Sequence, residues 1–320
     1  MRRRILRRLK RQYLKRMRKF VNRSFLFWQR LGFHVSPVHY YQPIPDTRRL
    51  DPDLWERRSS LVGVDMRPEA QLALLREFGR TYREECLAFT GPPRPGRFDI
   101  TNRMFGPVDA EMLYCMIRHN KPRKVIEIGS GHSTLLSAEA LERNAQEGRP
   151  GELIAYEPHP RRFLRDHPGI EVRKVPGERV PPAEIEALEA GDILFIDSTH
   201  TIRIGGDVQH EYRELVPRLP PGALVHIHDI FLPGEYPRHQ AMRFRRFWTE
   251  QYLVQAFLAF NSAFEVLWAS NYMSLDYSDD LRAAFPTFTG ERPASSLWLR
   301  RLPANEVPKP DGEGRVARAS

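Results

Sequence analysis

Residues 125–134 read VIEIGSGHST, and this stretch decides the fold. A short apolar run, interrupted only by Glu127, ends abruptly in Gly129, Ser130 and Gly131. A short apolar run bounded by glycines is typical of a buried strand, and glycines at a strand end let the backbone approach a ligand closely. The stretch therefore predicts a strand, a ligand-binding turn and a helix in succession.

Strand and helix patterns alternate from there to residue 301. Seven segments have the character of strands: 124–129, 152–158, 170–176, 192–200, 223–230, 263–270 and 295–301. The helical patterns between them include 133–144, 182–191, 207–219 and a long one over 238–260. This alternation predicts an α/β fold with a Rossmann-like, seven-stranded, mostly parallel sheet and helices on both faces.

Composition divides the chain into four regions. We expect a basic amphipathic helix over 1–30, a helical and extended cap region over 31–101, the α/β domain over 102–302 and a disordered tail over 303–320. The tail is rich in proline, glycine and charge, and has few apolar residues to bury. Cys86 and Cys115 have neither disulfide-framework nor metal-site spacing, so we expect small core residues in a reducing compartment.

The net charge of +10 belongs to one end of the chain. Residues 1–30 contain 13 Lys or Arg and no Asp or Glu, whereas the rest has 37 Lys or Arg against 40 Asp or Glu. A nearly neutral body does not indicate a nucleic-acid-binding surface, so we do not expect nucleic acid as a partner.

Within residues 1–30, apolar residues such as Leu9, Tyr13 and Phe20 recur at helical spacing among the bases. A basic amphipathic helix is typical of contact with an anionic membrane surface. A solvated tail and packing on the body or on a partner remain open. The region has no apolar run long enough to span a bilayer, so we expect a cytoplasmic protein, peripheral at the inner face of the membrane.

The glycine turn does not fit the common phosphate-binding patterns. The dinucleotide fingerprint needs a third glycine where Thr134 stands, and no Gly-Lys-Ser/Thr sequence follows. Glu127 precedes the turn and Glu157 ends the next strand, and such carboxylates can accept hydrogen bonds from an ammonium group and a ribose diol. A ligand with an ammonium group, a ribose and no phosphate fits, and S-adenosylmethionine is such a ligand.

Four segments in order resemble the motifs of class I S-adenosylmethionine-dependent methyltransferases: EIGSG over 127–131, Glu157 after IAY, DILFID ending at Asp197 and ALVHIHD ending at Asp229. The resemblance covers residues 102–301. One departure is the 28-residue interval from Gly129 to Glu157, which a loop over 144–151 would absorb. The resemblance implies cofactor contacts from Glu127, Gly129, Ser130, Gly131, Ser133, Glu157 and Asp197.

Within that class, FIDSTH followed by VHIHDIFLPGEYP resembles a bacterial subgroup associated with sugar and polysaccharide modification, and is similar to metal-assisted O-methyltransferases. The resemblance implies O-methylation of a sugar, a glycan or another small-molecule hydroxyl. The Asn/Asp-Pro-Pro-Tyr motif typical of amino-group methylation is absent after the fourth predicted strand, where DSTH stands instead.

Four polar residues lie at the ends of two predicted strands: Asp197, His200, His228 and Asp229. Histidine is the usual base near neutral pH, so we expect His200 to be the general base, with His228 and Asp229 also in the reaction site. Asp197, His228 and Asp229 would suit a divalent metal such as Mg or Mn, and the alternative is His228 as base without a metal. We expect His226 to be a core histidine that faces away from His228.

Two other functions remain open. An RNA methyltransferase would use the basic arm for phosphate contacts, and its binding would fall steeply with salt. A non-catalytic cofactor-binding or scaffold protein would pack Asp197, His200 and Asp229 together without an open pocket.

Overall fold

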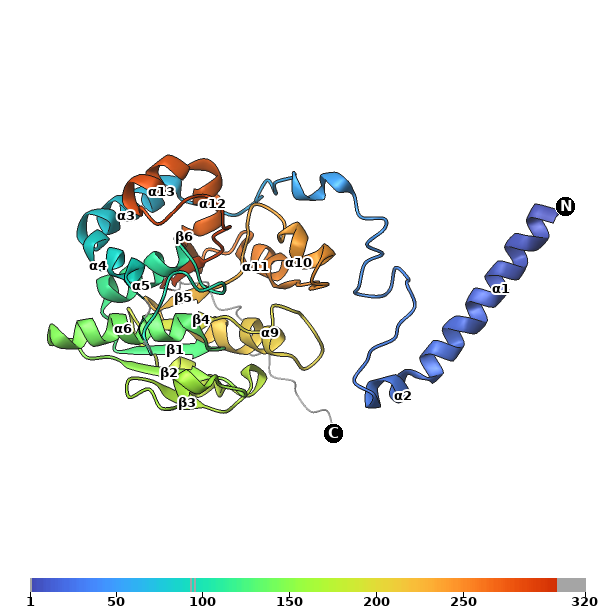
Figure 1. Ribbon diagram of the computed structural model, residues 1–320, viewed down its shortest axis with the longest axis horizontal. Helices are drawn as coiled ribbons and strands as arrows, with labels where there is room; N and C mark the ends of the chain where they lie inside the picture. The colour runs from blue at the N-terminus through green and yellow to red at the C-terminus, as the bar shows by residue number, and fades with distance from the viewer. Residues whose placement is uncertain (1, 93, 95, 304–320) are drawn as a thin grey trace, which may run out of the picture.

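The computed structural model describes residues 2–92, 94 and 96–303 (Figure 1). Its centre is a seven-stranded sheet with the order β3-β2-β1-β4-β5-β7-β6, in which only β7 runs antiparallel to its neighbours. The strands are β1 (Lys124–Ile128), β2 (Glu152–Tyr156), β3 (Glu171–Arg173), β4 (Ile193–Ile196), β5 (Leu224–Ile227), β6 (Phe264–Ala269) and β7 (Leu297–Arg301). The predicted fold class is therefore confirmed, and each observed strand is shorter than its predicted segment.

Alternate residues of the central strands are buried on opposite faces of the sheet, as the pleat of a strand requires. Val125 and Phe195 belong to one apolar cluster, and Ile126 and Leu194 belong to the other. The first cluster is covered by α3 (Pro68–Thr81), α5 (Asp109–Asn120), α6 (His132–Gln146) and α13 (Ser278–Ala284). The second is covered by α8 (Pro182–Glu186), α9 (Asp207–His210) and α11 (Glu250–Leu258).

The cap region shares the core of the α/β domain. The helical part of the predicted cap region is observed as α3 and α4 (Arg83–Leu87). Cys86 and Cys115 are buried side by side as free thiols, with 3.8 Å between their sulfur atoms, which confirms them as core residues.

The other α-helices after residue 101 are α7 (Arg162–Arg165), α10 (Arg238–Met242) and α12 (Ser270–Asp276). The boundary at residue 102 stays a prediction, and residues 304–320 of the predicted tail lie outside the described residues.

The predicted long helix over 238–260 is wrong. α10 ends at Met242, Arg245 adopts a left-handed backbone conformation (φ 59°), and α11 begins at Glu250. The backbone N–H groups of Thr249 and Glu250 donate to the carbonyl oxygen of His200, at 2.8 and 3.2 Å. The loop after β4 thus satisfies N–H groups that a helix start leaves unpaired, and the interruption brings Trp248 toward the sheet edge.

The predicted basic helix over 1–30 is observed as α1 (Arg2–Arg23) and α2 (Phe25–Arg30), with a break at Ser24. Figure 1 shows α1 standing apart from the α/β body. Leu6, Leu9, Tyr13 and Phe20 are exposed, by 57 to 65% of their surface. Among the described residues, no helix combines the length and the hydrophobicity needed to span a membrane.

Candidate active site

The glycine turn after β1 makes a close contact with the end of β4. Gly129 has a φ of 93°, and a Cβ atom there would overlap the backbone carbonyl oxygen of Asp197. Gly131 has an extended backbone, and a Cβ atom there would meet nothing within 4 Å. Gly129 is therefore required by the protein's own packing, whereas Gly131 leaves room for a ligand.

Glu127 is buried next to this turn and contacts it through Ser133. Its Oε1 accepts a 2.6 Å hydrogen bond from the Ser133 hydroxyl, while its Oε2 and the Ser130 hydroxyl are buried without a hydrogen-bond partner among the described residues. Burial raises the pKa of Glu127 to about 8, although hydrogen bonds from Ser133 and Thr134 act in the opposite direction. The unpartnered Ser130 hydroxyl beside the open side of Gly131 suits a polar ligand.

A cavity of about 590 Å³ opens at the carboxyl ends of the strands. Neither Glu127 nor Gly129 lines it, so both support the structure of the turn without contacting the cavity. The other predicted site residues all line the cavity: Ser130, Gly131, Ser133, Glu157, Asp197, His200, His228 and Asp229. The sheet edge therefore brings the predicted cofactor residues and the predicted reaction residues to one place.

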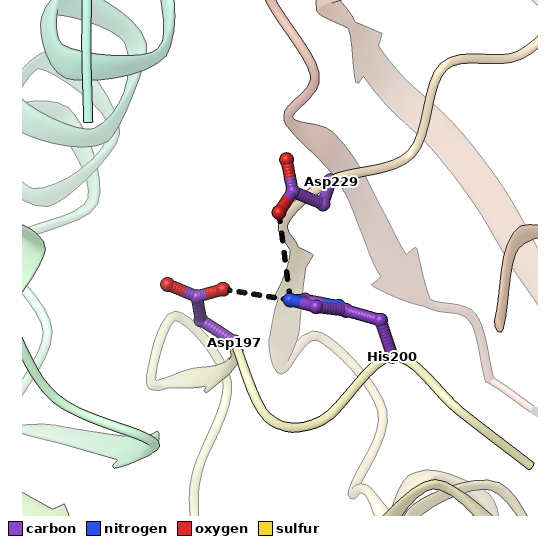
Figure 2. Close-up of side chains that lie close together, drawn as sticks. All are labelled: Asp197, His200 and Asp229. Carbon is purple, nitrogen blue, oxygen red and sulfur yellow. Dashed lines mark ion pairs between the residues drawn. The ribbon is translucent and has the colours of Figure 1, made fainter. Parts of the chain in front are cut away.

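His200 lies between two aspartates at this edge. Its Nε2 is 3.3 Å from Asp197 Oδ1 and 3.5 Å from Asp229 Oδ2, and Figure 2 shows that one nitrogen facing both carboxylates. One ligand atom from each residue falls within 4.8 Å of the others. His200 and Asp229 both have a φ of 57°, a conformation that costs roughly 1 kcal/mol or more in a residue other than glycine and is often found at functional sites.

The other ring nitrogen of His200 is held from α11. Nδ1 lies 2.8 Å from Glu250 Oε2, and Tyr212 donates a 2.8 Å hydrogen bond to Glu250 Oε1. A carboxylate accepts hydrogen bonds, so this contact assigns a proton to Nδ1 and turns Nε2 toward the aspartates. Burial alone would lower the pKa of His200, but its contacts with Asp197 and Glu250 and the charge of Asp229 hold that pKa well above its usual value.

His228 lies behind this trio. Its Nδ1 is 3.4 Å from Asp197 Oδ1, its Nε2 is 3.5 Å from Asp109 Oδ2, and its ring is 4.9 Å from that of Phe105. Asp109 is anchored by the backbone N–H groups of Ser295 and Ser296. The structure therefore converges on Asp197, His200 and Asp229, and not on the predicted metal set of Asp197, His228 and Asp229.

His226 is a core histidine, as predicted. Its ring stacks between Phe195 and Trp298, with centroids 4.1 and 4.5 Å away, and its Nε2 is 2.7 Å from the Ser296 hydroxyl. Its predicted orientation away from His228 is wrong, because the two rings are 6.1 Å apart. Residues two apart in a strand share a face.

Sequence reasoning missed four residues of the site: Asp109, Tyr212, Trp248 and Glu250. The ring of Trp248 is 4.7 Å from the ring of His200. Asp109 and Glu250 each open a helix, and an acid in a first helical turn is common, so no sequence signal separates them from ordinary helix starts.

The cluster holds an excess of negative charge. Its carboxylates are Asp109, Asp197, Asp229 and Glu250, and the basic side chains that contact them are, among the described residues, His200 and His228. Even with both histidines protonated, two negative charges remain uncompensated within the group. Buried charge of one sign calls for a counter-ion, so the edge of this cluster suits a cation.

Comparison with known proteins matches the segment of the chain that carries this site. Residues 126–230 match the family model described as a methyltransferase domain. An uncharacterised protein of Archaeoglobus fulgidus is 29% identical over 145 residues, which is 42% of this chain and 63% of that protein. The chain thus matches less than two thirds of that relative's length.

Two solved structures show further likeness, each at 12% identity. One is the O-methyltransferase from Bacillus cereus in complex with SAH, with a TM-score of 0.38 over 72% of this chain and 91% of that chain. The other is the MycE methyltransferase of mycinamycin biosynthesis in complex with Mg, SAH and mycinamycin VI, with a TM-score of 0.35 over 74% of this chain and 57% of that chain. Both scores are below 0.5, so these two structures assign no role to any residue of this chain. The residue roles below are inferred from contacts within the chain itself. The matched segment, residues 126–230, is therefore similar to a methyltransferase domain, and it contains the glycine turn, Asp197, His200, His228 and Asp229.

Proposed function

We propose that this protein transfers the methyl group of S-adenosylmethionine to a hydroxyl group on a sugar, a glycan or another small molecule. The observation that carries the proposal is the shared cavity, which is lined both by the glycine turn with Glu157 and by Asp197, His200 and Asp229. Holding a donor and an acceptor in line within one cavity provides much of the rate of such a displacement.

The cofactor would lie along the turn after β1. Gly131 leaves room for it, the unpartnered Ser130 hydroxyl offers it a hydrogen bond, and Glu157 can accept from its ribose. Glu127 would hold Ser133 and the turn in place without lining the cavity.

A divalent cation such as Mg or Mn would be held by Asp197, His200 and Asp229. The donor set of two carboxylates and one imidazole suits these ions, and the uncompensated negative charge of the cluster supports a cation. When bound, the cation would make the acceptor hydroxyl more acidic. Glu250 would orient His200 through its 2.8 Å contact with Nδ1.

The same geometry also supports a metal-free mechanism. The acceptor oxygen would form its bond to the methyl carbon as the carbon–sulfur bond breaks, and the hydroxyl proton would pass to Nε2 of His200 in its neutral form. Because Asp197, Glu250 and Asp229 raise the pKa of His200, this form is the minority at neutral pH and its share grows as the pH rises. Removing divalent ions with a chelator separates the two. Loss of activity with recovery on adding Mg or Mn supports the metal, and activity indifferent to the chelator leaves His200 as the base.

The open cavity supports an enzyme over a scaffold protein, which would close this space. The direct test incubates the protein with S-adenosylmethionine and a panel of hydroxyl-bearing sugars and metabolites, and detects methylated product by mass spectrometry. Glu157→Ala serves as the cofactor-site variant. Product from at least one hydroxyl acceptor, reduced in the variant, supports the proposal. Methylation of an RNA substrate alone would replace it with the RNA function.

The N-terminal arm suits the surface of an anionic membrane as its partner. Leu6, Leu9, Tyr13 and Phe20 follow helical spacing on α1 and are exposed, and 13 Lys or Arg accompany them within residues 1–30. Phosphate contacts of RNA would use the bases but leave the apolar row in water, whereas a lipid interface accepts both.

A further inference from the structure

The cavity has a basic rim above its acidic floor. Four exposed arginines line it: Arg103, Arg161, Arg246 and Arg292. Within the described part of the chain, none of the four lies within ion-pair distance of a carboxylate, whereas about half of the other arginines after residue 30 do. Apart from Glu157, the carboxylates that line the same cavity are those of Asp109, Asp197 and Asp229, which lie deeper, around His200 and His228. The rim therefore presents positive charge that the protein itself does not neutralise.

Three side-chain contacts fix the guanidinium of Arg246 at this rim. Its guanidinium lies 5.4 Å from the ring centroids of both Phe244 and Trp248, and its Nη1 is 3.3 Å from the side-chain oxygen of Gln240. Trp248 in turn contacts the ring of His200 at 4.7 Å. Aromatic faces orient a guanidinium without neutralising it, so Arg246 stands one ring away from the reaction residues with its charge available.

Arg292 reaches the rim from a different segment. Its Nη1 donates a 2.8 Å hydrogen bond to the backbone carbonyl oxygen of Asn102, and its guanidinium occupies the space over Gly106. Gly106 adjoins Phe105, whose ring is 4.9 Å from the ring of His228. A second fixed guanidinium therefore borders the cavity, next to the segment whose Phe105 contacts His228.

We infer that the methyl acceptor carries an anionic oxyacid group, a phosphate or a carboxylate, which binds the arginine rim at Arg246 and Arg292 while its hydroxyl faces Asp197, His200 and Asp229. S-adenosylmethionine carries a single carboxylate, whose one negative charge can neutralise one arginine at most, and its net charge at neutral pH is positive. The other arginines of the rim are left for an anionic acceptor. Guanidinium groups bind phosphate and carboxylate oxygens through paired hydrogen bonds. The rim thus selects anionic acceptors over neutral ones, and this selection rests on the proposed methyltransferase function.

The test measures binding to the protein loaded with S-adenosylhomocysteine, by calorimetry at low ionic strength. The probes are inorganic phosphate, glucose 1-phosphate, glucuronate and neutral glucose. Wild type is compared with Arg246→Gln, Arg246→Lys and Arg292→Gln. Arg213→Gln is the matched control, because Arg213 is exposed and lies outside the cavity.

The inference predicts saturable binding of inorganic phosphate and of at least one charged sugar, tighter than glucose by about ten-fold or more. Arg246→Gln and Arg292→Gln should each weaken anion binding about five-fold or more, Arg246→Lys should weaken it less, and Arg213→Gln should not change it. The preference between glucose 1-phosphate and glucuronate identifies the anion as phosphate or carboxylate.

Absence of saturable anion binding, or equal losses in Arg213→Gln, would overturn the inference. The first titration, with S-adenosylhomocysteine alone, separates this failure from failure of the proposed function. If S-adenosylhomocysteine binds and the anions do not, only the anionic acceptor is excluded. If S-adenosylhomocysteine itself does not bind, the methyltransferase function fails first.

Discussion

Glu250 holds the Nδ1 side of His200 at 2.8 Å, although the two residues are 50 positions apart in the sequence. The contact joins the first turn of α11 to the loop after β4, and the same loop accepts the backbone N–H groups of Thr249 and Glu250. It fixes which nitrogen of His200 faces Asp197 and Asp229.

Replacing Glu250 by Gln should therefore disorient His200. A partner of this kind typically contributes 10- to 100-fold to metal affinity or activity. We therefore expect the affinity for Mn to weaken about ten-fold or more. The loss of the electron paramagnetic resonance signal of free Mn measures this affinity. Binding of S-adenosylhomocysteine should persist, because Glu250 does not line the cavity. Glu178→Gln, at an exposed acid outside the cavity, is the control. Unchanged Mn affinity in Glu250→Gln would contradict a positioning role.

The two glycines of the turn should respond differently to alanine. Gly129→Ala meets both a φ of 93° and overlap with the Asp197 carbonyl, so we expect a loss of roughly 2 kcal/mol or more in the free energy of unfolding. Gly131→Ala places its methyl group in open space, so the unfolding free energy should stay within about 0.5 kcal/mol of wild type while cofactor affinity falls. Denaturant unfolding and calorimetry check the pair. Equal destabilisation, or full cofactor affinity in Gly131→Ala, would argue against the turn as the cofactor site.

The buried carboxyl group of Glu127 should make stability depend on pH. Its pKa is raised to about 8 from 4.5, so its contribution is fully present below pH 4.5 and is lost as the pH rises toward 8. Glu127→Gln removes this titration. Each unit by which folding shifts the pKa corresponds to about 1.4 kcal/mol in the free energy of unfolding. The Tm of Glu127→Gln relative to wild type should therefore increase from pH 5 to pH 8. Two Tm curves that stay parallel over this range would show that the carboxyl group does not titrate there.

Vesicle binding tests the N-terminal arm. We expect the full chain to co-sediment with vesicles containing phosphatidylglycerol and not with pure phosphatidylcholine, and to be released by high salt. Replacing the exposed Leu9 and Phe20 by Gln removes apolar area but no charge, and should weaken binding about ten-fold or more. Arg23→Gln is the control for loss of a single charge. Absence of binding to the anionic vesicles would contradict the membrane proposal, whereas binding that survives the apolar double variant would show that the exposed apolar residues do not contribute to it.

The sequence carries local information about this molecule and little about its long-range contacts. Buried strands followed by Gly129, Glu157, Asp197 and Asp229 were sufficient to predict the sheet and its ligand edge, because strand ends of a parallel sheet meet there. The sequence did not predict that His200, and not His228, would place a ligand atom close to those of Asp197 and Asp229. This arrangement depends on the left-handed backbone of His200 and Asp229 and on a contact with Glu250 from a distant helix. The break in the predicted helix over 238–260 has the same origin.

The central claim is that the turn after β1 binds S-adenosylmethionine, and calorimetric titration tests it most directly. Wild type and Glu157→Ala are titrated with S-adenosylmethionine, and NAD is the control ligand. We predict micromolar binding of S-adenosylmethionine alone, weakened about ten-fold or more in Glu157→Ala by the loss of a carboxylate that accepts hydrogen bonds from the ribose. Binding of NAD in its place, or no binding of either ligand, would contradict the assignment of the cofactor site.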